Sequence, residues 1–487
     1  MATTTRNRYL EANFGPVSEE ITVTDLPVTG TIPDHLDGRY LRNGPNPVVA
    51  PDPATYHWFV GTGMVHGVRL RDGKAAWYRN RWVRSRDVAE TLGEELRTGP
   101  VFAGFDIAPN TNVIGHGGRT FAIVESGARP YELTDELETI GPCDFDGTLP
   151  GGYAAHPHRD PATGELHAVS YFFGWGNKVQ YSVLGLDGRV RRTVDIEVGG
   201  SPMMHDFSLT ERHVVIYDLP VTFDLDGVAK AAPRPFRWPS RALAARFIGK
   251  RPIPERIVAA AMRSGGDPGF PYTWNPDYPA RVGVMPRDGG NADARWFDVN
   301  PCYVYHPLNA YEDGDDRIVL DLVRHPKMFA TDHAGPNEGT PTLDRWTADL
   351  SAGKVLEERL DDRGQEFPRI DERLTGRRHR FGYSVAVEDA EARSTLLKHD
   401  LPSGRTFTRS FGEGSGVSEF VFVPSSPDAA EDDGLLMGFV YDPASDRSSL
   451  ELLDAGTLDT VASVQLPVRV PHGFHGNWVD ASGATQP

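Results

Sequence analysis

The chain is a succession of short apolar runs, each ended by a turn signal. Runs such as RTFAIVE, RHVVIYDLPVTF, DRIVLDLV and LLMGFVYD are rich in β-branched and aromatic residues, and turns such as DPATGEL and GLDGRV separate them. The 51 glycines and 39 prolines are spread along the whole length. This pattern predicts an all-β fold, a sandwich, barrel or propeller. A strict repeat of about 40 residues is not visible, which argues against a simple repeat array but is compatible with a propeller that has irregular blades and long insertions.

The domain organisation is predicted to be simple. We find no low-complexity linker, so residues 1–487 are expected to form a single β-propeller domain with cap insertions. The clearest helical stretch runs from about residue 240 to residue 263, inside a helical cap segment expected at about 230–280. Pro252 and Pro254 should divide it into two short helices, because proline disrupts a helix interior.

The composition excludes several classes of protein. The formal net charge of -18 argues against a nucleic-acid partner, since phosphate binding needs a basic surface. Two cysteines fit a reducing compartment and exclude a thiolate metal cluster. The N-terminal residues lack a signal-peptide core, and we find no apolar run of about 18 residues that could span a membrane. A cytoplasmic location is therefore expected.

Four histidines lie in unusually apolar settings at the edges of expected strands. They are His156 in YAAHPHRD, His205 in PMMHDFSLT, His306 in YVYHPLNAYE and His475 in HGFHGNW. Any one of them alone would be interpreted as a core histidine whose nitrogens are hydrogen-bonded. Four in the same kind of setting, from distant parts of the chain, could converge on a propeller axis. Imidazole suits Fe, Zn, Cu or Ni.

Three glutamates occupy similarly apolar, strand-like contexts. They are Glu125 in FAIVESG, Glu366 in GQEFPRI and Glu419 in VSEFVFVP. A histidine that binds a metal usually donates its other N–H to a carboxylate or carbonyl, so the glutamates are candidate partners. The alternative is that each is a surface glutamate at a strand end.

The sequence resembles the carotenoid cleavage oxygenase family over nearly its whole length. The blocks that carry the resemblance are GRYLRNGPNP, HWFVGTGMVHGVRL, NTNVI, AHPHRDPATGEL, MMHDFSLTE, YHPLNAYE, EFPRIDERLTG, SEFVFVP and GFHGNW. They occur in the family's order, from about residue 8 to residue 478. The resemblance implies a seven-bladed β-propeller, capped by loops and short helices, with a non-haem Fe(II) on its axis.

The resemblance also assigns site residues. It implies that the iron ligands are His156, His205, His306 and His475, and it excludes the neighbouring His158 and His472. Glu125 is expected behind His205, Glu366 behind His306 and Glu419 behind His475, whereas His156 has no expected carboxylate partner. Thr111, in NTNV, matches a position whose side chain crowds one open site on the iron; otherwise it is an ordinary turn threonine.

The implied reaction adds O2 across one C=C bond of an alkene and gives two carbonyl compounds. Val124 stands where the phenolic branch of the family commonly has a lysine, which favours a carotenoid or apocarotenoid over a stilbenoid or phenylpropene. Phe270, Tyr272 and Trp274 either line a tunnel for such a polyene or pack in a cap loop. A further alternative is a non-catalytic binding propeller that keeps only the fold.

A basic, partly apolar segment suggests how a water-insoluble substrate could reach the protein. Residues 230–263 carry nine lysines and arginines and one acid, Glu255. Short basic helices with an apolar face lie in the interface of anionic bilayers. One expectation is a peripheral membrane contact through residues 236–262. The other is a cap helix packed on the propeller, with its arginines paired to the acidic body.

Overall fold

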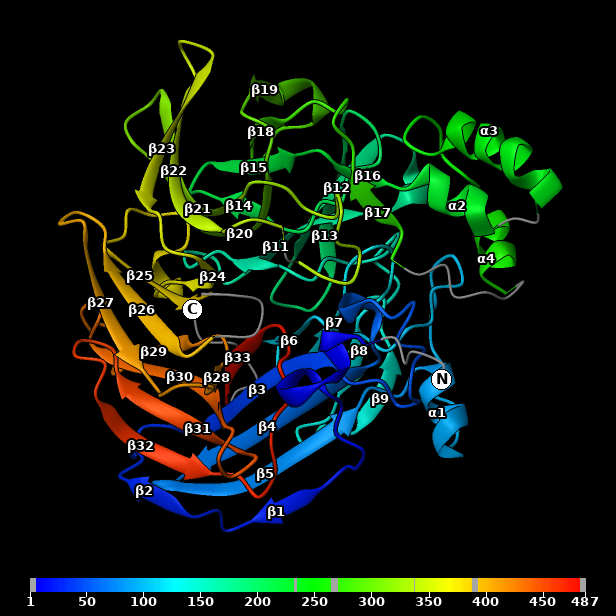
Figure 1. The fold of residues 1–487 in the computed structure, drawn as a ribbon. Helices are drawn as coiled ribbons and strands as arrows, with labels where there is room; N and C mark the ends of the chain where they lie inside the picture. The colour runs from blue at the N-terminus through cyan, green and yellow to red at the C-terminus, as the bar shows by residue number, and fades with distance from the viewer. Residues whose placement is uncertain (1–5, 232–233, 264–269, 337, 388–392, 482–487) are drawn as a thin grey trace.

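The strands surround a central axis as the blades of a propeller (Figure 1). The computed structural model describes the chain except for residues 1–5, 232–233, 264–269, 337, 388–392 and 482–487. It contains seven antiparallel sheets of four to six strands and one separate two-stranded ribbon. The expected seven-bladed β-propeller is therefore confirmed.

Five of the blades are four-stranded and are formed by strands in chain order, from the axis outward. Blade 2 contains β6 (Asn112–His116), β7 (Arg119–Ile123), β8 (Tyr131–Leu133) and β9 (Thr139–Pro142). Blade 3 contains β10 (His158–Arg159), β11 (Leu166–Tyr171), β12 (Lys178–Leu184) and β13 (Val190–Glu197). Blade 4 contains β14 (Phe207–Leu209), β15 (His213–Asp218), β18 (Arg281–Pro286) and β19 (Arg295–Asp298).

Blades 5 and 6 follow the same plan. Blade 5 contains β20 (Tyr303–Glu312), β21 (Arg317–His325), β22 (Thr342–Asp349) and β23 (Lys354–Asp361). Blade 6 contains β24 (Gln365–Arg369), β25 (Phe381–Ala386), β26 (Thr395–Asp400) and β27 (Arg405–Ser410).

Blades 1 and 7 each combine strands from both ends of the chain. Blade 1 contains β1 (Thr22–Thr24), β5 (Lys74–Trp82), β4 (Gly63–Arg71), β3 (Gly38–Pro45) and the late strand β33 (Gly476–Asp480). Blade 7 contains β28 (Gly416–Val417), β29 (Val421–Pro424), β30 (Gly434–Asp442), β31 (Arg447–Asp454), β32 (Thr460–Gln465) and the early strand β2 (Val28–Gly30). Two strand pairings, β33 with β3 and β2 with β32, thus join the beginning of the chain to its end, and each closes the ring of blades.

Burial decreases from the axis outward. Every residue of the inner strand β20 except Glu312 is buried, whereas the outer strand β23 has no buried residue and alternates between exposed and partly buried positions from Lys354 to Glu358. Since side chains alternate between the two faces of a strand, this outer pattern shows one face turned to a neighbouring blade and one to solvent. The apolar core fills the spaces between blades, and its largest cluster extends over blades 3, 4 and 5.

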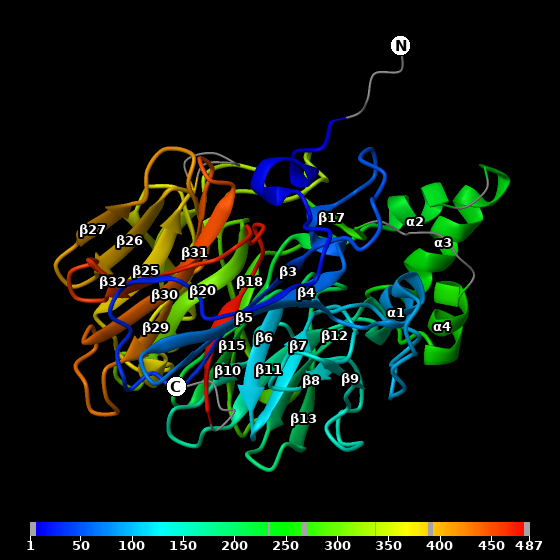
Figure 2. The ribbon, with the colours of Figure 1, turned by 90° about the horizontal axis from the view of Figure 1, so that it is seen from below.

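A long insertion between β15 and β18 supplies helices and a ribbon. The ribbon pairs β16 (Val221–Phe223) with β17 (Tyr272–Trp274). Between them lie α2 (Leu225–Ala231), α3 (Arg237–Phe247) and α4 (Glu255–Arg263), which stand beside the sheets (Figures 1 and 2). The helices α3 and α4 are separate, as expected from Pro252 and Pro254. The single-domain boundary stays a prediction.

The remaining helices are short. They are α1 (Arg86–Leu92) and the 3-10 turns η1 (Arg8–Leu10), η2 (Ala12–Phe14), η3 (Trp58–Val60), η4 (Phe173–Trp175), η5 (Arg234–Phe236), η6 (Asn291–Asp293) and η7 (Glu372–Leu374). Within the described part of the chain, every helix is too short or too polar to cross a bilayer.

Candidate metal centre

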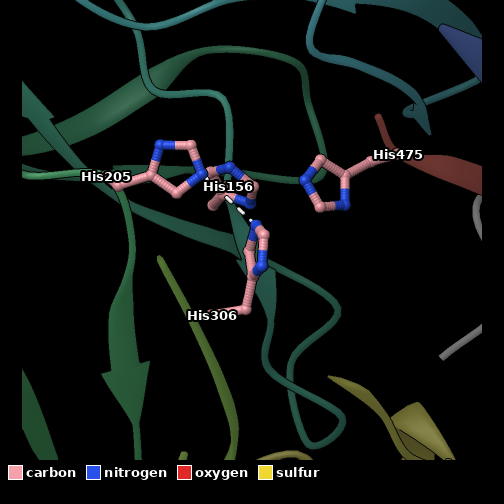
Figure 3. Close-up of side chains that lie close together, drawn as sticks. All are labelled: His156, His205, His306 and His475. Atoms are coloured by element: carbon pink, nitrogen blue, oxygen red, sulfur yellow. Dashed lines mark hydrogen bonds between the residues drawn. The ribbon is translucent and has the colours of Figure 1, made fainter. Parts of the chain in front are cut away.

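The four histidines singled out in the sequence meet on the propeller axis (Figure 3). One ring nitrogen from each lies within 4.8 Å of the corresponding nitrogens of the other three. His156 and His205 each stand two residues before an innermost strand, β10 and β14, and His475 directly precedes β33. His306 lies within β20, where the pairing with β21 is irregular on both sides of Pro307. Proline lacks an N–H for the ladder, which explains the break.

The rings pack face to edge with little solvent contact. The ring centroid of His156 lies 4.4 Å from that of His205 and 4.5 Å from that of His475, and those of His306 and His475 are 4.7 Å apart. None of the four residues is more than 8% exposed. Burial and the three neighbouring imidazoles hold the pKa of His156 well below its ordinary value. This ring is therefore neutral, the state in which imidazole binds a metal.

Three of the histidines donate to the glutamates expected behind them. The distance between Nδ1 and a carboxylate oxygen is 2.9 Å for His205 and Glu125, 2.6 Å for His306 and Glu366, and 3.0 Å for His475 and Glu419. An ionised carboxylate only accepts hydrogen bonds, so the proton of each ring is on Nδ1. In the neutral form of each ring, Nε2 then carries a lone pair.

The ring nitrogens at the centre of the cluster face one another. His205 Nε2 and His306 Nε2 lie 3.3 Å apart, so two acceptors face each other. His156 Nε2 is buried and has no hydrogen-bond partner among the described residues. Unpaired buried acceptors are costly, and a cation between them removes that cost. The donor set therefore fits a transition-metal ion bound by four imidazoles.

The environment of His156 differs from that of the other three. Its Nδ1 is 3.8 Å from Asp206 Oδ2, which is too long for a hydrogen bond. Asp206 instead accepts from His158 Nε2 at 2.8 Å and from the N–H of Phe207 at 2.6 Å. Among the described residues, His156 thus has no carboxylate partner at hydrogen-bonding distance, and His158 points to Asp206.

Two residues that sequence reasoning missed hold the glutamates in place. His325 Nε2 lies 2.7 Å from Glu366 Oε1, so this carboxylate serves two histidines. Arg369 Nη1 lies 3.6 Å from Glu419 Oε1. Burial alone would raise the pKa of Glu419, but Arg369 and His475 hold it at about 2. The only sequence signal for His325 is an imidazole at the end of the apolar run RIVLDLVRH.

A large cavity opens on one side of the cluster. Its volume is about 860 Å³, and His205, His306 and His475 form part of its wall. Apolar and aromatic side chains dominate the rest of the lining, among them Phe59, Ile107, Val124, Phe270, Tyr272, Tyr305 and Phe474. Trp274, which was expected beside Phe270 and Tyr272, is absent from this lining. A second cavity of about 100 Å³, lined by His156, Asp206 and Arg369, lies on the other side.

Thr111 stands at the edge of the large cavity, beside the cluster. Its carbonyl accepts from the N–H of His475 at 3.0 Å, and its hydroxyl donates to Asn110 Oδ1 at 3.0 Å. Asn110 in turn donates to the carbonyls of Phe59 and Gly61. The backbone of Thr111 therefore positions the last histidine, while its buried side chain is held in a fixed orientation.

Comparisons with known proteins agree with this geometry. The family model described as "Retinal pigment epithelial membrane protein" matches residues 14–480. The carotenoid cleavage oxygenase of Mycobacterium tuberculosis is 57% identical over 496 residues, with 98% of each chain covered. The lignostilbene dioxygenase of Pseudomonas brassicacearum superimposes with a TM-score of 0.81 at 26% identity, covering 99% of this chain and 100% of that one. Cobalt-substituted Synechocystis apocarotenoid oxygenase gives 0.78 at 26% identity, covering 96% and 97%.

Proposed function

Because this chain belongs to the family of retinal pigment epithelial membrane protein and the carotenoid cleavage oxygenases, we propose that it is a non-haem Fe(II) dioxygenase. It cleaves one C=C bond of a carotenoid or apocarotenoid with O2 and gives two carbonyl products. The observation that carries this proposal is the cluster of four buried imidazoles, three of them backed by carboxylates, in the wall of an apolar cavity.

The donor set supports iron as the ion. His156, His205, His306 and His475 are proposed as the ligands, and imidazole suits a divalent transition metal. Glu125, Glu366 and Glu419 offset its charge from outside the ligand shell. When bound, ferrous iron supplies the redox chemistry that O2 needs to react with an alkene, which zinc cannot supply.

The rest of the site binds and orients the alkene. The aromatic wall, with Phe59, Phe270 and Tyr305, excludes water and holds a long apolar chain against the histidines. Thr111 restricts the space next to His475, so that the substrate reaches the cluster from the cavity. Val124, 8% exposed, lines the cavity where a lysine would bind a phenolic hydroxyl, which supports a polyene over a stilbenoid.

Metal analysis and product analysis test this proposal together. Purified active protein should contain one iron ion per chain, and His205→Ala and His306→Ala should each lose both iron and activity. His35→Ala, a change of an exposed histidine, is the matched control. Zinc in place of iron in active protein would refute the redox reaction. Mass spectra of products from carotenoids, apocarotenoids and lignostilbene-type alkenes then identify the bond that is cleaved.

The helices of the insertion supply a second part of the proposal, a peripheral contact with an anionic lipid surface. The structure describes no buried residue in α3, and the large apolar side chains Phe236, Trp238, Leu243 and Ile257 are 54–78% exposed. Basic residues surround them, and Arg241 forms an ion pair with Asp226. By contrast, α4 buries Val258 against the cluster around Phe172. Exposed apolar groups with surrounding basic charge fit a bilayer interface.

Co-sedimentation with liposomes tests this contact. The wild type should bind vesicles that contain anionic lipid, and a variant with Arg246, Lys250 and Arg251 changed to Glu should bind far less. Each basic residue near such a surface contributes about 1 kcal/mol, and added salt screens it. Equal binding by the two proteins, or no binding by the wild type at low salt, would remove this part of the proposal.

A further inference from the structure

One buried charge in the wall of the large cavity, that of Arg393, forms no ion pair with a carboxylate of the described residues. Two carboxylates in the cavity wall, the partly buried Glu125 and the buried Glu366, are each hydrogen-bonded to histidines. Arg393 also lines the cavity and is 9% exposed. Among the described residues, no carboxylate forms an ion pair with Arg393, and its Nε has no hydrogen-bond partner. Among the described residues this guanidinium therefore has no carboxylate bonded to it, and the Glu366 carboxylate, which acts on it electrostatically, is already hydrogen-bonded to two histidines.

Two aromatic rings position the guanidinium. Its Cζ lies 5.7 Å from the ring centroid of Trp58 and 5.2 Å from that of Phe367, and both rings line the same cavity. A cation over an aromatic face is stabilised, and arginine stacks well on such faces. An aromatic ring offers no oxygen acceptor, so these contacts leave the N–H groups of the guanidinium to find acceptors elsewhere.

The missing partner is expected to be an anion. Burial lowers the pKa of Arg393, but an arginine side chain stays protonated in proteins. A buried charge without a partner is strongly unfavourable. A guanidinium offers parallel N–H donors, which match the two oxygens of a carboxylate in a bidentate pair. A ligand carboxylate would therefore supply the bidentate partner that none of the described residues supplies.

Arg393 is also close enough to the histidine cluster for one ligand to reach both. The Phe367 ring, which Arg393 covers, stacks on His306 with centroids 5.6 Å apart and 25° between the planes. The same ring lies 5.6 Å from His475. Only one aromatic ring therefore separates the guanidinium from the proposed metal ligands.

We propose that Arg393 binds a carboxylate at the end of a polyene, so that the preferred substrates are acidic apocarotenoids. This inference rests on the proposed function for the identity of the polyene, and on Arg393 alone for its acid end. An uncharged end group, such as a hydrocarbon ring or an alcohol, would leave the guanidinium without its counter-ion.

Ligand binding tests the inference without turnover. All-trans-retinoic acid and all-trans-retinol share the polyene and differ in the end group, and both quench tryptophan fluorescence, here that of Trp58 among others. At about pH 8 the acid is ionised. The wild type should bind the acid roughly tenfold more tightly than the alcohol, the usual effect of a hydrogen bond to a charged group. Equal affinities for the two ligands would overturn the inference.

Variants of Arg393 test whether this residue causes the preference for the acid over the alcohol. Arg393→Met should remove the preference for the acid while retinol affinity changes by no more than about twofold, because it keeps the unbranched apolar stem of the side chain and loses the charged group. Arg393→Lys should keep part of the preference, since lysine retains the charge without the planar fork. Arg405→Met, on the outer strand β27, is the control for replacing an arginine. An unchanged preference in Arg393→Met, or in the equally uncharged Arg393→Gln if the first variant fails to fold, would also overturn the inference.

The same measurements separate this inference from the proposed function. A wild type that cleaves polyenes but binds the two retinoids equally would overturn the role of Arg393 and leave the dioxygenase proposal intact. A wild type that prefers the acid through Arg393, but cleaves no polyene when loaded with iron, would support the acid-binding site and refute the dioxygenase proposal.

Discussion

Replacing Glu366 with glutamine tests how the outer carboxylates support the histidine cluster. Glu366 Oε2 accepts from His306 Nδ1 at 2.6 Å and from the N–H of Phe367 at 2.5 Å, while Oε1 accepts from His325 Nε2 at 2.7 Å. Burial alone would raise the pKa of this carboxyl, but the two histidines hold it well below its ordinary value. Glu366→Gln keeps the shape and removes the charge.

The hydrogen bonds of Glu366 indicate how far the glutamine substitution should lower metal affinity. Glutamine has one acceptor oxygen, so its amide must face one of the two histidines. If the oxygen stays with His306 and Phe367, then His325 must move its proton to Nδ1. His306 keeps its orientation but loses the carboxylate that makes it more basic. The loss of such a partner typically lowers metal affinity 10- to 100-fold, or about 1.4 to 2.8 kcal/mol.

The assay is anaerobic titration of the metal-free protein with Co(II) or Fe(II) in competition with a chelator. Glu366→Gln should bind the ion 10- to 100-fold more weakly. The control is Glu451→Gln, a buried glutamate of blade 7 that accepts from Ser449 and Ser463. Adding His325→Gln to Glu366→Gln should cost less than the two single effects combined, because both changes break the same contact. Wild-type affinity in Glu366→Gln would show that the contact with His306 does not support metal binding.

Three further outcomes concern stability. Chelation of the metal should lower the melting temperature, because an ion present at about 100 times its Kd stabilises the folded state by about 2.7 kcal/mol; an unchanged Tm would contradict a bound ion. Glu312→Gln should destabilise the protein in a pH-dependent way: burial would raise the pKa of Glu312, but His213 and Thr210 hold it at about 2. The pKa of Glu312 in the folded protein is below that of a glutamate in the unfolded chain. The wild type should therefore exceed the variant in Tm by its largest amount above about pH 4.5, and this difference should vanish as the pH falls toward 2. A difference that grows in acid would refute this prediction. Trp478→Ala, in the closing strand β33, should lower the free energy of unfolding measured with denaturant by about 3 to 5 kcal/mol, because Trp478 is in the core and 3% exposed. A loss below about 1 kcal/mol would mean that β33 contributes little to stability.

The architecture followed from the family resemblance and not from a visible repeat. The structure shows why no period could be found in the sequence. Blade 4 is interrupted between Asp218 and Arg281 by the ribbon and three helices. Blades 1 and 7 take strands from opposite ends of the chain, so neither is contiguous in sequence. A local pattern could indicate strands, but not which of them share a sheet.

The site was predictable only in part. The apolar contexts of His156, His205, His306 and His475 made them candidates, and the structure brings all four together. The pairing of each glutamate with its histidine came from the resemblance. His325 and Arg393 could not be found in this way, because their importance depends on contacts between distant segments. His325 reaches Glu366 across 41 positions, and Arg393 lies over rings from η3 and β24.

Because the last strand closes the ring of blades, three of the four histidines are synthesised well before the fourth. The blades that carry His156, His205 and His306 are complete once β23 has been made at Asp361, while His475 comes only just before β33. At about 5 to 20 residues per second, the ribosome needs from several seconds to a few tens of seconds to make the chain between them. During that interval a growing chain offers three imidazoles and an open position, which is the ligand set of catalytic zinc sites. Loading with the proposed iron would then depend on exchange after closure, or on keeping zinc away from the unfinished chain.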